Sequence, residues 1–168
     1  HHLPGHSPDC IAVLLGNEAI IVGDIVLPDI TPWPTREEVF DEVAEVIKPH
    51  YTQPNEIFGL HRYIQSLKKL GAIAGKHPDM LVLPAHRFYY KGRWNGLQLA
   101  ERVTELLEHH VQRCAAIIEI LRTGPKTSEE LAREHFEERL LEGFGSIMAA
   151  NEIVSHCEYL IACGDMVG

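Results

Sequence analysis

The sequence of 168 residues contains no apolar run close to the roughly 20 residues that a membrane-spanning helix requires, so no membrane segment is expected. Basic residues are few: 15 Lys and Arg stand against 24 Asp and Glu, and the net charge of −9 argues against a general affinity for polyanions. No C-x-x-C pair occurs, which argues against a disulfide framework and predicts reduced thiols in a cytoplasmic protein. The sequence also has no start methionine and no readable targeting segment. The four cysteines lie in apolar surroundings at positions Cys10, Cys114, Cys157 and Cys163.

Hydrophobic residues make up 45% of the chain, which is ordinary for a globular protein. Apolar runs at residues 10–15 and 19–22 flank Gly16-Asn17 and predict a β-hairpin. Their near-continuous hydrophobicity predicts strands covered on both faces, and a third buried strand is expected at residues 80–83. Between the hairpin and this strand, two helices are predicted, so the fold class is α/β.

The first of these helices is expected at residues 35–48, opened by a capping box of Thr35 with Glu38 and stopped by Pro49. The second is expected to begin at an Asn55 cap and to end before Gly71, because its apolar residues recur at helical spacing.

Near residue 95 the sequence changes from short apolar runs to apolar residues that recur at helical spacing, which predicts two domains at residues 1–94 and 95–168. Helices are expected at residues 97–121, 127–136 and 146–162, the second opened by a capping box of Thr127 with Glu130. Three helices with a short middle one resemble a winged-helix module. From residue 96 onward, 13 acids and 6 bases give a net charge of −7, which argues against a nucleic-acid-binding surface.

Three potential metal ligands lie where loops meet the predicted strands. His6 follows Pro4-Gly5 directly before the first strand, and these two residues fix an irregular backbone that positions a side chain. Asp24 follows the second strand, where a carboxylate is costly to bury without a positive partner. His86 follows the third strand, and strand ends are where α/β folds assemble ligand sites.

The order of these motifs resembles the second half of the metallo-β-lactamase fold superfamily. The resemblance rests on Pro-Gly-His-Ser-Pro, then a hairpin ending in Gly-Asp, then Pro-Ala-His, over about residues 3 to 94. It implies one half of an αββα sandwich, followed by a winged-helix-like helical tail. It also implies a metal-dependent hydrolase of esters, thioesters, lactones or phosphodiesters, acting on a small-molecule substrate.

The resemblance further implies two divalent metal ions, with zinc expected and iron or manganese as alternatives. Asp24 is then the bridging and catalytic carboxylate, with His6 on the first metal and His86 on the second. The ions would act as Lewis acids and activate water for attack on a carbonyl or phosphoryl centre.

The family's first two motifs, written H-x-H-x-D-H, are absent from this sequence. We therefore expect a fragment that is metal-poor and inactive by itself. Its inner sheet face would be apolar and would associate with the missing N-terminal half of the fold or form a homo-oligomer. Two other functions stay open: a winged-helix nucleic-acid-binding protein and a metal-free interaction protein.

The tail also matches one branch of this superfamily. His109 and Arg113 have its His-x-x-x-Arg spacing, and the segment 156–164 has the spacing of its last helix. His110 and Cys114 share a helix face, where core packing is favoured over metal binding.

Three aromatic residues follow the third ligand and either line a substrate pocket or pack between the two regions: Tyr89, Tyr90 and Trp94. Ser7 has no base or orienting acid near it in the sequence, which argues against serine catalysis.

Overall fold

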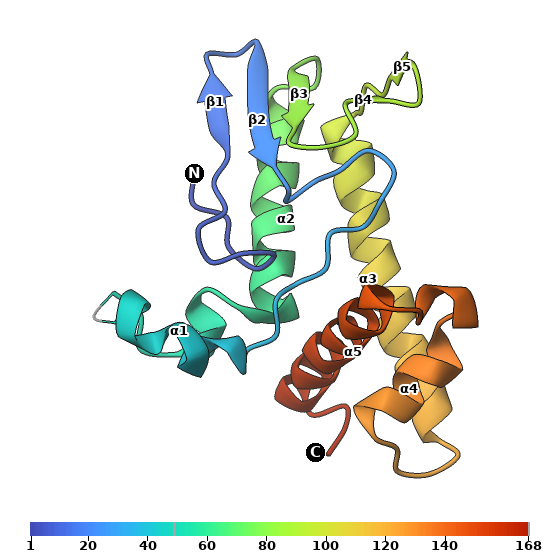
Figure 1. Ribbon diagram of the computed structural model, residues 1–168. Coiled ribbons are helices and arrows are strands. Elements are labelled where there is room, and N and C mark those ends of the chain that lie inside the picture. Colours follow the sequence, from blue (N-terminus) through green and yellow to red (C-terminus); the bar gives the residue numbers. More distant parts are fainter. Residues whose placement is uncertain (49, 168) are drawn as a thin grey trace.

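The computed structural model describes residues 1–48 and 50–167 and contains one three-stranded sheet, a small β-hairpin and a set of helices (Figure 1). Pro49, which is expected to end the first helix, lies outside the described residues. In chain order the elements are β1 (Val13–Leu15), β2 (Ala19–Gly23), α1 (Val39–Ile47), the 3₁₀ turn η1 (Pro54–Glu56), α2 (Gly59–Lys76), β3 (Leu81–Pro84), β4 (Tyr89–Tyr90), β5 (Arg93–Trp94), α3 (Leu99–Leu121), α4 (Ser128–His135), the 3₁₀ turn η2 (Glu138–Leu140) and α5 (Phe144–Cys163).

The sheet has the order β1-β2-β3 and is mixed. The predicted hairpin is confirmed: β1 and β2 are antiparallel and joined by a turn in which Gly16 has φ +58°. β3 pairs with β2 in parallel, with Ile20 opposite Val82. A parallel partner requires a crossover, and here the chain crosses through α1 and α2.

The two faces of the sheet have different surroundings. Side chains of Ile20, Val22 and Val82 are buried in one cluster with residues of α2, which runs behind the strands in Figure 1. The alternate side chains are exposed on the other face: Val13, Leu15, Ile21 and Leu81. The expectation of strands covered on both faces is therefore wrong for the described residues, because only one helical layer packs against the sheet.

Three helix ends in the first half differ from those that the sequence pattern predicted. Thr35 does not cap a helix, because its hydroxyl donates to the backbone carbonyl of His6 (2.6 Å), and α1 begins only at Val39. Asn55 lies in η1 rather than at a cap, and α2 begins at Gly59. α2 continues through Gly71 to Lys76, so the expected end at Gly71 is also wrong.

In the second half the expectations match more closely. α3 spans Leu99–Leu121, and α5 ends at Cys163, followed by Gly164, whose φ of +80° is the left-handed conformation of a glycine cap. The capping box of Thr127 and Glu130 is confirmed in both directions.

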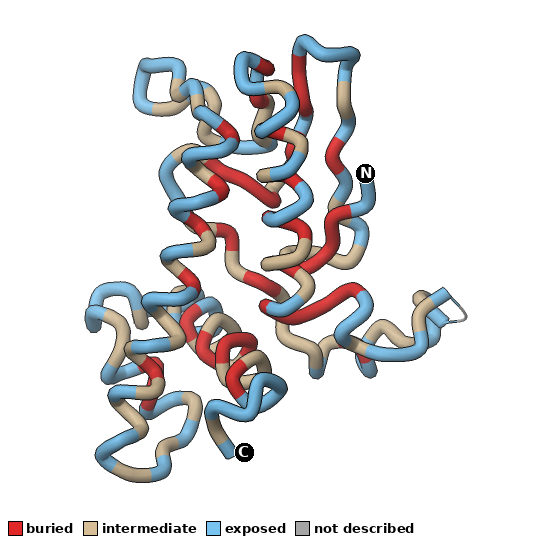
Figure 2. Tube along the Cα trace, turned by 180° about the vertical axis from the view of Figure 1, so that it is seen from behind, coloured by how far each residue is buried: buried red, intermediate tan, exposed pale blue. Residues whose placement is uncertain are grey.

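Two main clusters of buried residues lie along α3, and Figure 2 shows buried positions in both regions. The first joins the sheet and α2 with Leu99, Val103 and Leu106 of α3. The second lies among α3, α4 and α5 and includes Ile117 and Ile153. α3 thus contributes to both clusters, whereas the division at residue 94 stays a prediction. Among the described helices, none combines the length and the apolar character needed to cross a lipid bilayer.

Replacing Thr127 by Ala tests the capping of α4. The threonine hydroxyl accepts from the Glu130 amide at 3.2 Å, and alanine leaves this amide without its partner. We expect the free energy of unfolding to fall by about 1 kcal/mol in urea denaturation. Thr127→Ser keeps the hydroxyl and is the matched control, so an equal loss in both variants would contradict the capping role.

Candidate metal centre

Asp24 and His86 lie together at the carboxyl edge of the parallel strands. Asp24 follows Gly23, the last residue of β2, and His86 lies two residues beyond β3. The amide of Ala85 donates to the carbonyl of Gly23 (2.9 Å), which extends the strand contact to the loops. As a result His86 Nε2 lies 3.3 Å from Asp24 Oδ1. Parallel strands bring their following residues to one edge, which accounts for this contact.

His6 is held by a turn that only glycine allows. Gly5 has φ +132°, and a Cβ there would lie 2.4 Å from the backbone of Tyr63 in α2. The Ser66 hydroxyl of the same helix donates to the carbonyl of Pro4 (2.7 Å). The turn that carries His6 therefore packs directly against α2, which holds it in place.

The ring of His6 has a defined orientation. Its Nδ1 lies 2.7 Å from the backbone carbonyl of Trp33, and the two rings meet edge to face at 5.6 Å. Because a carbonyl only accepts, a neutral His6 carries its proton on Nδ1 and leaves the lone pair of Nε2 free. Metal-binding histidines commonly make this contact.

The three predicted ligands line one hollow of about 440 Å³. The remaining wall comes from the loop after β2, from Arg87 and from one residue of α5, and comprises Leu27, Ile30, Thr31, Pro32, Trp33, Arg87 and Met148. Sequence reasoning did not identify Trp33 or Met148, because neither belongs to a motif; only the fold brings them to the ligands.

The donors in the hollow fit part of a metal site. Imidazole nitrogen and carboxylate oxygen suit zinc, iron and manganese. Asp24 Oδ1 is buried and faces His86 Nε2 at 3.3 Å, but it makes no hydrogen bond to a described residue, so a cation at this oxygen would offset the cost of its burial. Within residues 1–48 and 50–167, however, no three His, Cys, Asp or Glu side chains lie close enough together to hold one metal. The described chain therefore provides an incomplete set of ligands.

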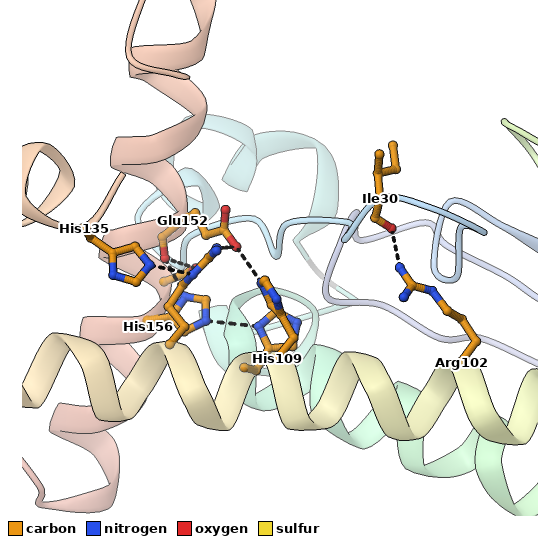
Figure 3. A network of polar contacts seen from close by, with 9 residues as sticks. Ile30, Arg102, His109, His135, Glu152 and His156 are labelled. Atoms are coloured by element: carbon orange, nitrogen blue, oxygen red, sulfur yellow. Dashed lines mark hydrogen bonds and ion pairs between the residues drawn. The ribbon is translucent and has the colours of Figure 1, made fainter. Parts of the chain in front are cut away.

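A second polar cluster joins the three tail helices (Figure 3). Arg113 of α3 forms an ion pair with Glu152 of α5, and its Nε donates to His135 of α4 (3.1 Å). His110 Nδ1 and His156 Nε2 are 3.0 Å apart, and both rings are buried. His109 and Arg113, which have the family's His-x-x-x-Arg spacing, both face Glu152 of α5, and His156, which begins the second matching segment, contacts His110 of α3. His110 packs in the interior, as favoured above.

Burial is the main cause of the perturbed pKa values in this cluster. It lowers the pKa of His110, with the adjacent His156 and His109 acting in the same direction. It lowers the pKa of His156 as well, with a further contribution from Arg113. The pKa of His109 falls to about 4 through burial and the charges of Arg113 and Arg102. These histidines are therefore neutral near pH 7.

The aromatic residues after His86 do not line the hollow. They form the β4–β5 hairpin, in which the rings of Tyr89 and Trp94 lie 4.9 Å apart and are exposed, while Arg87 lies over Tyr90. Tyr89, Tyr90 and Trp94 are therefore not part of the wall of this hollow, and none of the three is buried between the two regions. Ser7 donates its hydroxyl to Asp9, a local turn contact.

Two solved structures resemble this chain over nearly its whole length. A β-lactamase domain protein from Burkholderia ambifaria matches 98% of the chain with a TM-score of 0.74 and 26% sequence identity. A metallo-β-lactamase family protein from Thermus thermophilus matches 97% with a TM-score of 0.66 and 25% identity. The fold is that of the metallo-β-lactamase superfamily. No protein-family model and no curated protein matches the sequence.

The resemblance to the metallo-β-lactamase fold that the motifs indicated is thus confirmed. The chain spans 42% and 43% of the lengths of these two structures. Its division into a half-sandwich and a winged-helix-like tail stays a prediction. In the described residues α3, α4 and α5 pack around one cluster, and no strand follows α5 up to residue 167.

Acidification tests the buried histidines of the tail. Since the folded state disfavours protonation of His110 and His156, an unfolded chain takes up more protons below pH 6.5, and stability falls as the pH is lowered. Each contributes about 1 kcal/mol per pH unit. Burial raises the pKa of Glu158 to about 7, so its protonation stabilises the folded state as the pH is lowered. This gain offsets the loss from one of the two histidines.

We expect the free energy of unfolding in urea to be lower at pH 5 than at pH 7, and the difference to shrink in His156→Gln. His50→Gln, which changes an exposed histidine, is the control. A stability that is independent of pH across this range would contradict the burial of neutral rings.

Proposed function

We propose that this chain contributes His6, Asp24 and His86 to the site of a metal-dependent hydrolase of the metallo-β-lactamase fold. The observation that supports this most directly is that residues from three separate motifs line one hollow, where Asp24 Oδ1 is 3.3 Å from His86 Nε2. This Asp24 oxygen is buried and, apart from its contact with His86, has no hydrogen-bond partner among the described residues.

The expected cofactor is a pair of divalent ions, with zinc favoured over iron or manganese. When bound, such ions supply Lewis-acid activation of water and of the substrate's carbonyl or phosphoryl oxygen. Asp24 is the candidate to bridge them, because it offers a buried carboxylate oxygen at the strand edge. His6 offers Nε2 from a ring that contacts Trp33, and His86 offers a ring that is 67% exposed and lies beside Asp24.

The walls of the hollow suit a small-molecule substrate. Leu27, Trp33 and Met148 provide apolar surface beside the ligands, and Arg87 provides a cation. Apolar walls with a few convergent polar groups are typical of small-molecule sites. The charge of the tail, −7 from residue 96 onward, argues against the nucleic-acid-binding alternative.

The exposed sheet face supports a role for a further layer of protein. Val13, Leu15, Ile21 and Leu81 lie side by side on the strands and face away from α2. In the proposed arrangement, the complementary half of the fold covers this face and supplies the absent ligands. The chain alone would use the same face to form a homo-oligomer. A cytoplasmic location is part of this proposal, since the four cysteines are free.

Metal binding by the chain tests the ligand assignment. In equilibrium dialysis against Co²⁺ or Zn²⁺ we expect less than one equivalent to be retained, because no three His, Cys, Asp or Glu side chains of the described residues lie close enough together to hold one ion. Asp24→Asn and His86→Gln should each lower the retained metal further. His77→Gln, at the end of α2, is the control. Stoichiometric metal with hydrolase activity in the isolated chain, or binding unchanged by Asp24→Asn, would contradict the assignment.

Sedimentation velocity tests the exposed sheet face. We expect the chain to sediment as a dimer or larger species, and Ile21→Glu to shift it to the monomer, because a charge would then lie in the apolar contact. Ile161→Glu is a matched control, since Ile161 on α5 is 44% exposed and Ile21 is 41% exposed. A monomeric parent chain, or equal effects of both substitutions, would argue against this interface.

A further inference from the structure

We propose that three residues of the helical tail, Arg102, Asn151 and Glu158, are positioning residues for His6. They act through the loop 25–38, which joins β2 to α1 and lies between His6 and the tail helices. The inference rests on the proposed function only in treating His6 as a metal ligand; the contacts themselves can be tested without metal.

The loop 25–38 has no regular secondary structure. Backbone groups of such a segment have no ladder or helix to fix them, so its position depends on contacts with its surroundings. These contacts come from two directions, the His6 turn on one side and the tail helices on the other.

On the first side, the loop holds both the ring and the backbone of the His6 turn. The carbonyl of Trp33 accepts from His6 Nδ1 at 2.7 Å. The Thr35 hydroxyl donates to the His6 carbonyl at 2.6 Å, and the Thr35 amide donates to the Gly5 carbonyl at 2.9 Å. A displacement of residues 33–35 would therefore displace the ring of His6.

On the second side, two side chains of α5 form hydrogen bonds with the backbone of the same stretch of the loop. Asn151 Nδ2 donates to the Pro34 carbonyl at 2.9 Å, and its Oδ1 accepts from the amide of Arg36 at 3.5 Å. The two carboxylate oxygens of Glu158 each lie 3.0 Å from the amide of Glu37. Trp33 and Thr35 thus lie within two residues of groups that α5 fixes.

α3 holds the earlier part of the loop through one guanidinium. Arg102 Nε donates to the Leu27 carbonyl at 2.8 Å. Its Nη2 donates to the Ile30 carbonyl, also at 2.8 Å (Figure 3). A planar guanidinium can bridge two carbonyls in this way, whereas an ammonium cannot match the geometry. The loop is therefore fixed at both ends by helices that follow the strands and ligands in the sequence.

The consequence for the site lies in the tautomer of His6. As long as the Trp33 carbonyl stays in place, neutral His6 carries its proton on Nδ1, and Nε2 keeps the lone pair that a cation requires. If the loop is released, this constraint is lost and the proton redistributes between the two nitrogens. The tail helices thereby influence whether His6 can act as a ligand.

The test uses the chain labelled with ¹⁵N-histidine, in which long-range ¹H–¹⁵N NMR correlations report the protonated ring nitrogen. His6→Gln assigns the signal. We expect His6 to be an Nδ1–H tautomer in the parent chain and to become a mixture of tautomers in Asn151→Ala. Hydrogen exchange at the Thr35 amide should become about tenfold faster, as expected for loss of one hydrogen bond.

Asn95→Ala is the matched control, because Asn95 also donates from Nδ2 to a backbone carbonyl, that of Arg87 at 2.8 Å, and this bond lies outside the loop 25–38. Arg102→Lys is a second, milder variant that should alter the His6 signal in the same direction. An unchanged tautomer and unchanged Thr35 exchange in both Asn151→Ala and Arg102→Lys would overturn the inference, as would an equal effect of Asn95→Ala.

Metal titration separates this inference from the proposed function. If the tautomer shifts in Asn151→Ala and Co²⁺ binding is lowered by both Asn151→Ala and His6→Gln, both are supported. If the tautomer shifts but His6→Gln leaves Co²⁺ binding unchanged, the positioning contacts are supported and the ligand role of His6 is wrong.

Discussion

When two parallel strands pair in register, the residues that follow them lie at one edge of the sheet, and the candidate metal centre depends on this constraint. β2 and β3 pair in parallel and shift register between Ile21 and Gly23, so that Gly23 lies opposite Pro84 and Asp24 lies near His86, although two helices separate the two strands along the chain. The third predicted ligand, His6, lies on a turn that is held by α2 rather than by the sheet. The centre therefore combines one sheet edge with one helix-supported turn.

The elements that sequence reasoning predicted well are those whose signal is local. The hairpin, the long helix α3 and the Thr127 box each depend on neighbouring residues, and the structure contains all three. Thr35 shows why other predictions failed, because it has the pattern of a cap but its hydroxyl bonds to His6, 29 residues away. A competing long-range partner leaves no trace in a local pattern.

In the candidate site, too, features with a local sequence signal could be predicted and features set by long-range contacts could not. Its three predicted ligands follow from motifs and line one hollow, whereas the residues that contact the loop beside His6 could not be predicted in this way. Arg102 and Asn151 act on backbone carbonyls, which every residue possesses, so their partners carry no sequence signature. The buried pair His110 and His156 was equally invisible, since only the packing of α3 against α5 places the rings together.

α3 runs through both large clusters of buried residues, with Val103 in one and Ile117 in the other. Both clusters therefore depend on the same continuous helix. If α3 unfolds from one end, the cluster at that end loses its contacts first and the other cluster loses its contacts next. Such sharing makes melting cooperative across the whole chain, so that the sheet and the tail should lose their order in a single transition.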